Sequence, residues 1–318
     1  MANGKSDHKL VKTLAIIILV VIASFFRIDV TDVIPEETIN STTDGATTVE
    51  GELIVHMIDC GQADSFLLVQ GEKTCLVDCG TRGTGKDVVK YLKELGVTKL
   101  DYIIGTHPHD DHMGGMYDVL CNFETGTIIL PKVKSGQVTT NWYLKLMNKI
   151  KSDKCQVEFA EVGDVYNIED AKMQIIAAQR DCNNLNNYSI VTKVSFGEID
   201  MIMTGDAETE VEEEILKSRV NIDAEILKVG HHGSDTSSSE EFLDAINPDY
   251  SLISCEVGNQ HEHPIKSTMD KLKERNIEVY RTDESGSVVI TITSNDINFN
   301  CKPGDYLSGI ELEEKVTK

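Results

Sequence analysis

One short stretch, residues 106–115 (THPHDDHMGG), constrains the fold more than any other part of this chain. It places three imidazoles and two carboxylates in six consecutive positions, directly after the apolar run YIIG. Such a run predicts a strand, so the cluster lies at a strand's carboxyl end, just before a helix expected to begin near Gly114 or Gly115. His107 and His109 alternate around a proline, and both rings can face the same way in an extended segment. Because imidazole and carboxylate are ligands of Zn²⁺, Mn²⁺ or Fe, the pattern predicts a metal site.

Short apolar runs elsewhere predict strands, and amphipathic stretches between them predict helices. The predicted strands are 52–58, 66–70, 74–79, 102–106, 126–131, 173–178, 189–196, 200–205, 224–230, 249–257, 277–282 and 286–293. The predicted helices are 86–95, 142–151, 208–218, 239–246 and 265–276. Strands come first with few helices between them, and helices later alternate with strands. We therefore expect an α/β (α+β) fold in which outer helices cover two sheets, an αββα sandwich.

Further candidate ligands follow strands that lie far from this stretch in the sequence. Asp206 ends the run MIMTGD, although it could instead cap the helix that follows, because Asp is favoured there. His231 and His232 end the run AEILKVG, and two adjacent histidines before a glycine are seldom a core feature. His263, in NQHEHP, is a further candidate, with a plain surface loop as its alternative.

These motifs together resemble a known family. THPHDDHMGG, TGD and a distal histidine are similar to the metallo-β-lactamase superfamily of di-metal hydrolases. More narrowly, MIDCGQADSFLLVQ, TCLVDCGT, NNYSIV, LKVGHHGSDTSSS, HP and YRTDESGSV resemble the metallo-hydrolase domain of the ComEC family of DNA-uptake proteins. They occur in that family's order and cover roughly residues 52–293, so the resemblance extends over the whole expected domain.

The resemblance implies two divalent metal ions, with Zn²⁺ favoured and Mn²⁺ or Fe as alternatives. It implies ligand roles for His107 and His109 at one metal, Asp111 and His112 at the other, and Asp206 between them. It implies that His232 is a ligand of the second metal and His231 faces the substrate, although a swap of the two stays open. It also implies that His263 lies on the substrate side, and that Asp59 and Asp78 brace the ligands from behind.

One departure from the wider superfamily concerns the third histidine ligand of the first metal. That region here reads DCNNLNNYSIV and contains no histidine, so Asn186 or Asn187 takes the equivalent place as a weak ligand or a substrate contact. Asparagines also suit a plain turn, which is the alternative.

These expectations predict a metal-dependent hydrolase of phosphate esters or phosphodiesters. A hydroxide shared by two metals would attack, with Asp111 orienting it, while His231 and His263 stabilise the phosphoryl oxygen or protonate the leaving group. A carboxylic ester, lactone or lactam hydrolase is the enzymatic alternative. A non-catalytic accessory role in DNA uptake is the other.

The N-terminus predicts an extracytoplasmic location. Residues 1–27 place three lysines before the apolar run 14–26, which indicates a signal anchor or a cleaved signal peptide, with the rest of the chain outside the cytoplasm. Residues 28–51 read as an acidic flexible linker, residues 52–300 as the hydrolase domain and residues 301–318 as a polar C-terminal tail. Eight cysteines without a CxxC pair indicate mostly free, buried thiols.

Net charge bears on the choice of partner. The formal net charge is −23, which disfavours nucleic acid because phosphate contacts come from Lys and Arg. We therefore expect a small-molecule or cell-wall phosphoester as substrate, and contact with the membrane through the N-terminal segment. Nucleic acid stays a second choice, and the sequence leaves the oligomeric state open.

Overall fold

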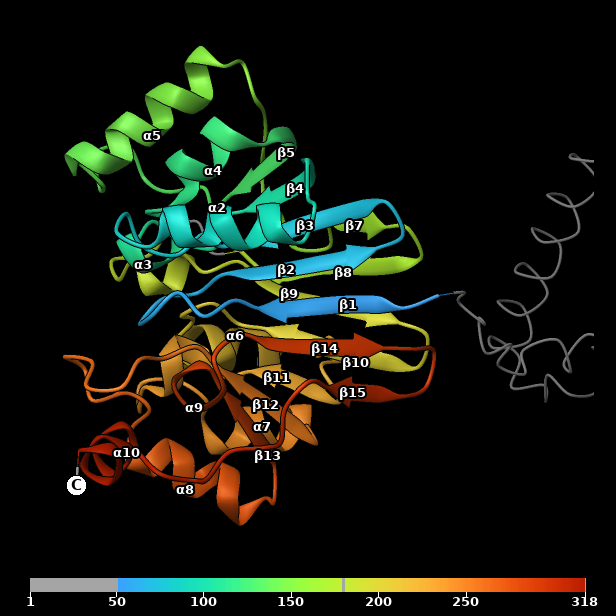
Figure 1. Ribbon diagram of the computed structural model, residues 1–318, viewed down its shortest axis with the longest axis vertical. Coiled ribbons are helices and arrows are strands. Elements are labelled where there is room, and N and C mark those ends of the chain that lie inside the picture. Colours follow the sequence, from blue (N-terminus) through green and yellow to red (C-terminus); the bar gives the residue numbers. More distant parts are fainter. Residues whose placement is uncertain (1–50, 179–180, 318) are drawn as a thin grey trace, which may run out of the picture. The chain divides into compact units, whose positions relative to one another are not determined.

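The apolar runs pair into two sheets that lie face to face (Figure 1). The computed structural model describes residues 51–178 and 181–317, which belong to one compact unit. In that part of the chain one sheet has eight strands, in the order β15 (Ile297–Phe299), β14 (Val288–Ile292), β1 (Leu53–Met57), β2 (Phe66–Gln70), β3 (Lys73–Val77), β4 (Lys99–Ile104), β5 (Glu124–Leu130) and β6 (Gln156–Phe159). The other has seven, in the order β13 (Glu278–Arg281), β12 (Tyr250–Ile253), β11 (Ile226–Lys228), β10 (Ile199–Met203), β9 (Val191–Phe196), β8 (Ala171–Ala177) and β7 (Val165–Ile168).

Each sheet is antiparallel in one part and parallel in the other. Strands β3 to β6 are parallel to one another, as are β10 to β13. Parallel neighbours require crossover connections, and helices supply them. These helices are α2 (Gly85–Glu94), α3 (Asp110–Met113), α4 (Met116–Asn122), α5 (Asn141–Ser152), α6 (Thr209–Ser218), α7 (Glu240–Ile246) and α8 (Lys266–Glu274).

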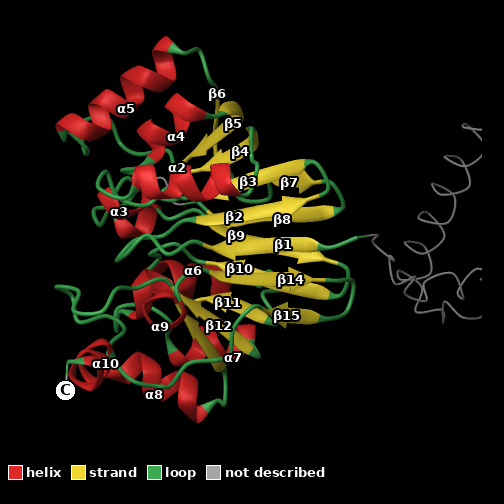
Figure 2. Cartoon of the chain, viewed as in Figure 1, coloured by secondary structure: helices red, strands yellow, loops and turns green. Residues whose placement is uncertain are grey.

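Side chains of the strands divide between an inner core and two outer cores. Leu53, Val55 and Met57 of β1 point between the sheets, where they belong to the same cluster as Met173 and Ile175 of β8. One outer core lies under α2, α4 and α5, and the other under α6, α7 and α8. The layers are helix, sheet, sheet and helix (Figure 2), which confirms the predicted αββα sandwich.

Several elements were not predicted from the sequence. Strands β6, β7 and β15 have three or four residues each, and about half or fewer of those residues are buried. Their apolar patterns are therefore too short to be distinguished from loops. The structure also has the short helices α9 (Thr282–Ser285), η3 (Asn186–Tyr188) and η4 (Gly230–Gly233).

The C-terminal residues differ from the predicted polar tail. Helix α10 (Gly309–Val316) begins with a capping box, in which the Ser308 side chain accepts a hydrogen bond from the Glu311 backbone N–H. Leu312 is buried, and the Gly309 backbone N–H donates to the Pro264 carbonyl oxygen over 2.8 Å. The end of the chain is thus packed against the loop that carries His263. The serine and glutamate three residues apart are the sequence signal that would have indicated it.

Two other expectations concern the cysteines and the N-terminus. All eight cysteines are free thiols, as expected for most of them, but only half of them are buried, namely Cys60, Cys75, Cys79 and Cys255. The expected signal segment, residues 1–27, and all but the last residue of the expected linker lie outside the described residues. Among the helices described, none is both long and apolar enough to cross a bilayer.

Candidate metal centre

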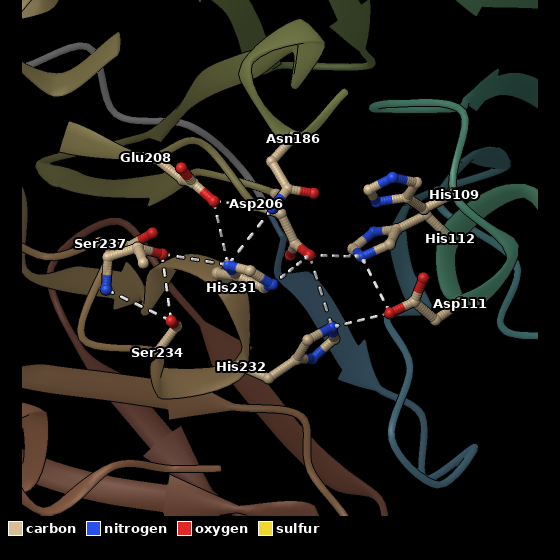
Figure 3. Close-up of polar contacts among 12 residues, drawn as sticks. His109, Asp111, His112, Asn186, Asp206, Glu208, His231, His232, Ser234 and Ser237 are labelled. Atoms are coloured by element: carbon tan, nitrogen blue, oxygen red, sulfur yellow. Dashed lines mark hydrogen bonds and ion pairs between the residues drawn. The ribbon is translucent and has the colours of Figure 1, made fainter. Parts of the chain in front are cut away.

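Three segments from different strand ends meet at one point (Figure 3). The first follows β4, the second follows β10 and the third follows β11. They bring Asp111, His112, Asp206 and His232 so close that one ligand atom from each lies within 4.8 Å of all the others. Carboxylates and imidazoles at this spacing could hold a metal ion.

The local fold of the HxHxDH stretch explains its close-packed ligands. His107 is fully buried and His109 is extended, and His107 Nε2 lies 3.0 Å from His109 Nδ1. Helix α3 then begins at Asp110, so Asp111 and His112 turn away on a helical turn. The glycine after this turn is required by packing, because a Cβ atom on Gly115 would lie 2.0 Å from the Cys79 carbonyl oxygen.

Asp78 contacts His112 from behind the cluster. Its Oδ2 lies 2.7 Å from His112 Nδ1, and its two carboxylate oxygens also accept hydrogen bonds from the backbone N–H and the hydroxyl of Thr106. A proton held on Nδ1 by this carboxylate leaves Nε2 free to bind a metal.

The His231–His232 pair is presented by an unusual backbone. Both residues adopt left-handed conformations, with φ of 50° and 54°. Such strain in consecutive non-glycine residues is typical of functional sites. His232 Nδ1 lies 2.8 Å from the Ser254 carbonyl oxygen, which directs Nε2 toward Asp111 at 3.4 Å. His232 is buried, whereas 23% of the His231 side chain is exposed, so His232 has the inner position and His231 the solvent side.

Asp206 lies at the centre of the cluster. Its Oδ2 is 3.2 Å from His112 Nε2, and 3.7 to 3.8 Å from Nε2 of the other histidines around it, which are His107, His231 and His232. The helix-capping alternative is not what the structure shows, because Glu208 occupies the N-cap of α6. Asp206 is therefore available as a shared ligand.

The two asparagines have different surroundings. Asn186 Oδ1 is buried without a hydrogen-bond partner, and its Nδ2 donates to Glu208 Oε1 over 2.8 Å and lies 3.5 Å from His231 Nδ1. Asn187 instead accepts from the Glu208 backbone N–H through Oδ1 and donates to Glu210 through Nδ2. Asn186 belongs to the cluster, and Asn187 holds the start of α6.

Unpaired atoms show that the cluster suits a cation. His112 Nε2 and His232 Nε2 are buried without hydrogen-bond partners, and both face Asp206 Oδ2. Buried polar atoms are normally satisfied, so two orphaned atoms that converge on one place indicate a missing ligand. Nitrogen and oxygen donors in this arrangement fit Zn²⁺, Mn²⁺ or Fe.

Electrostatics divide the histidines into two groups. Burial alone would lower the pKa of His112 and of His232, yet adjacent carboxylates, chiefly Asp206, raise both above the ordinary value. His107 and His109 lie farther from the carboxylates, and burial lowers the pKa of each. Burial would likewise raise the pKa of Asp206, but His112 and His232 hold it well below its usual range. A bound metal would supply the positive charge that protonation would otherwise give to His112 and His232.

The sequence prediction missed two residues behind the cluster, Asp64 and Lys228. Asp64 Oδ2 lies 3.8 Å from His112 Nδ1 and 2.6 Å from Lys228 Nζ, and both residues are buried. Asp59, predicted to brace the ligands, is exposed, and its Oδ1 accepts a hydrogen bond from the Gly61 backbone N–H. Asp64 takes the bracing position expected for Asp59. Lys228 inside the mostly apolar run AEILKVG was the only signal for the lysine, and Asp64 lies in the partly polar stretch GQADSF between two strands.

His263 is buried beside His231. Its ring centroid is 5.4 Å from that of His231, and its Nδ1 is buried without a partner. Burial and the nearby histidines lower the pKa of His263 to about 3. The loop is held against the histidine pair, because a Cβ atom on Gly233 would lie 2.4 Å from the Pro264 Cβ.

The fold and this cluster define the class of protein. Residues 58–256 match the family described as the Metallo-beta-lactamase superfamily, and the chain belongs to it. Among solved structures it is similar to CmlA, a diiron beta-hydroxylase from Streptomyces venezuelae, with a TM-score of 0.51 and 13% identity over 77% of this chain and 55% of that one. That likeness shows the fold alone.

Curated relatives give the narrower resemblance. The chain is 31% identical to ComE operon protein 3 of Bacillus subtilis over 258 residues, which are 75% of this chain and 33% of that protein. It is 30% identical to competence protein ComA of Neisseria gonorrhoeae, over 75% of this chain and 32% of that protein. The predicted resemblance to ComEC-type competence proteins is confirmed, and the chain spans about a third of the length of these relatives.

Proposed function

We propose that this protein is a hydrolase of phosphate esters or phosphodiesters that works with two divalent metal ions, with zinc favoured. The observation that carries the proposal is the set of orphaned ligand atoms around Asp206. Bound metals would supply a Lewis acid and an activated water at neutral pH. His107 and His109 would hold one ion, Asp111, His112 and His232 the other, and Asp206 both.

The chain's own residues support the remaining roles. Asp111 is directed toward the cluster from the first turn of α3 and is placed to orient an attacking water. The partly exposed His231 and the buried His263 lie side by side, where they can donate hydrogen bonds to a phosphoryl oxygen or a leaving group. Asn186 supplies an amide where the wider superfamily has a third imidazole, and its Oδ1 is free for a weak metal bond or a substrate contact.

A cavity beside the cluster supports a small substrate. It has a volume of about 660 Å³ and is lined by Gln62, Thr81, Asp110, Asp111, Glu256 and neighbouring residues up to His261. No lysine or arginine lines it. Long nucleic acids are bound mainly through lysine and arginine side chains, and the cavity has none. Its lining therefore favours a small or cell-wall phosphoester.

The test combines metal analysis with a substrate panel. We expect the purified protein to bind two equivalents of metal and to release p-nitrophenol from bis-p-nitrophenyl phosphate. Both a chelator and the Asp206→Ala variant should abolish that release, while the folded state persists by circular dichroism. Activity that survives either treatment would overturn the proposal. Carboxylic esters and lactams in the same panel test the acyl-hydrolase alternative.

A role in DNA uptake is the second candidate, and the similarity to ComE operon protein 3 and competence protein ComA is the observation that favours it. A salt-dependent DNA-binding assay separates the candidates, because binding that weakens steeply with salt would support the DNA role.

We also propose that the domain acts outside the cytoplasm, secreted or tethered by its N-terminal segment. Three lysines precede the apolar run 14–26 in that segment, which supports this orientation. Protease accessibility on intact cells tests this location.

A further inference from the structure

Lys228 is a fully buried lysine directly behind the candidate metal centre. It is the last residue of β11, only 1% of its side chain is exposed, and it pairs in register with Met203 of β10. Strand β10 leads to Asp206, so the register brings the ammonium group to the base of the turn that carries this carboxylate. A buried ammonium group is costly unless it is paired and hydrogen-bonded, so its position requires an explanation.

The contacts of Lys228 all lie on the protein side of the cluster. Its Nζ is 2.6 Å from Asp64 Oδ2 and donates to the Gly205 carbonyl oxygen over 3.0 Å. It also lies 3.8 Å from Asp206 Oδ1. The other oxygen of Asp206, Oδ2, faces the imidazoles at 3.2 to 3.8 Å. One oxygen of the central carboxylate therefore faces the Lys228 ammonium group, and the other faces the imidazoles.

A second group of potential ligands lies on this inner side. Asp64, Asp78 and His112 also have ligand atoms within 4.8 Å of one another. Because the Lys228 ammonium group already contacts Asp64, this inner group holds a cation of the protein's own. Asp64 also lies close to the two imidazoles proposed to hold the same ion. Its Oδ1 is 3.5 Å from His232 Nδ1, and its Oδ2 is 3.8 Å from His112 Nδ1.

We propose that Lys228 is a positioning residue of the metal centre: a permanent internal cation that holds Asp64 and the Oδ1 side of Asp206, so that Oδ2 is presented to the metals. This inference rests on the proposed metal-dependent function. Residues that orient ligands from behind typically change metal affinity by about 10–100-fold when they are replaced.

The test uses Lys228→Met, which keeps an unbranched apolar stem and removes the ammonium group. Lys193→Met is the matched control, because Lys193 is also buried in the same sheet and paired with an aspartate, 2.7 Å from Asp200 Oδ2, but it contacts no residue of the cluster. Zn²⁺ affinity is measured by competition with a chromophoric chelator, and the folded state by urea unfolding of the metal-free protein. We expect Lys228→Met to weaken Zn²⁺ binding by about 10–100-fold, whereas Lys193→Met lowers stability and leaves Zn²⁺ affinity unchanged.

Two further variants keep the inference open to refutation if Lys228→Met does not fold. Lys228→Arg retains the charge, and Lys228→Met combined with Asp64→Asn removes the charge pair together. We expect the arginine variant to bind Zn²⁺ more tightly than the double variant. Wild-type affinity in any folded variant without a cation at 228, or an equal loss in Lys193→Met, would overturn the inference. Wild-type protein that binds Zn²⁺ but cleaves no phosphoester would overturn the proposed function alone.

Discussion

The two halves of the candidate metal centre are built differently. The half around His112 and His232 is braced from behind by Asp78, Asp64 and Lys228, which hold the Nδ1 atoms or the neighbouring carboxylates in place. The half around His107 and His109 has only hydroxyl partners at His107 Nδ1, from Thr106 and Ser189, and an amide where a third imidazole would stand. If the proposed two-metal function is right, this difference predicts one tight and one loose metal subsite in the same cluster.

The largest effects are expected when a single ligand is removed, either from one half of the cluster or from the other. His232→Ala should bind one equivalent of Zn²⁺ instead of two and lose activity by about 10³-fold or more, because residues that act as a unit fail together. His109→Ala should lose the weaker equivalent and keep the tighter one. Metal titration of the two variants checks this, and loss of the same equivalent in both would show that the halves are not separate subsites.

The bracing of the tight half is tested next. Asp78→Asn should weaken Zn²⁺ binding at that subsite by about 10–100-fold, because the amide no longer fixes the proton on His112 Nδ1. Asp59→Asn is the matched control, since Asp59 is exposed and its carboxylate accepts a hydrogen bond from the Gly61 backbone N–H in the same turn rather than from a residue of the cluster. Equal losses in the two variants would contradict the structural difference between these aspartates.

The loose half should respond to an added imidazole. Asn186→His should tighten the weaker Zn²⁺ equivalent by about tenfold, or about 1.4 kcal/mol, because imidazole is a better ligand than an amide oxygen. Asn187→His should leave metal affinity unchanged, since that side chain faces the start of α6. Isothermal titration calorimetry measures both, and a gain in the second variant alone would reverse our assignment of the two asparagines.

The smallest effect concerns acid stability and the buried His263. The pKa of His263, about 3 in the folded protein, lies below its ordinary value of 6.5, so the unfolded chain takes up the proton first. The free energy of unfolding should therefore fall as the pH is lowered from about 6.5 toward 3. His263→Gln should reduce this loss. Urea unfolding at pH 7 and pH 5 checks the prediction, and identical slopes in both proteins would contradict it.

The sequence predicted those parts of the site that lie next to one another in the chain or end a long apolar run. His107, His109, Asp111 and His112 share one stretch, and Asp206 follows a buried strand, so their convergence could be predicted from strand ends alone. The orientation of Asn186 against Asn187 could not, because it depends on Glu208 and Glu210 of a helix reached later in the chain.

The sequence also did not show the residues that brace the ligands, the strands at the edges of the sheets or the C-terminal helix. Asp64 and Lys228 meet only because the two sheets pack face to face, a contact that no local pattern encodes. Strands β6 and β7 lie at sheet edges with exposed residues and carry too few apolar positions to indicate a strand. Helix α10 has a capping box but only one buried large apolar side chain, Leu312.

The left-handed backbone at His231 and His232 has a consequence for engineering. A non-glycine residue in this conformation costs about 1–2 kcal/mol, and glycine relieves most of that cost. A library of variants selected only for heat resistance should therefore accumulate glycine at these two positions and lose the site while its melting temperature rises. Any stabilised form of this protein intended for use as a catalyst must be selected with metal binding as a second criterion.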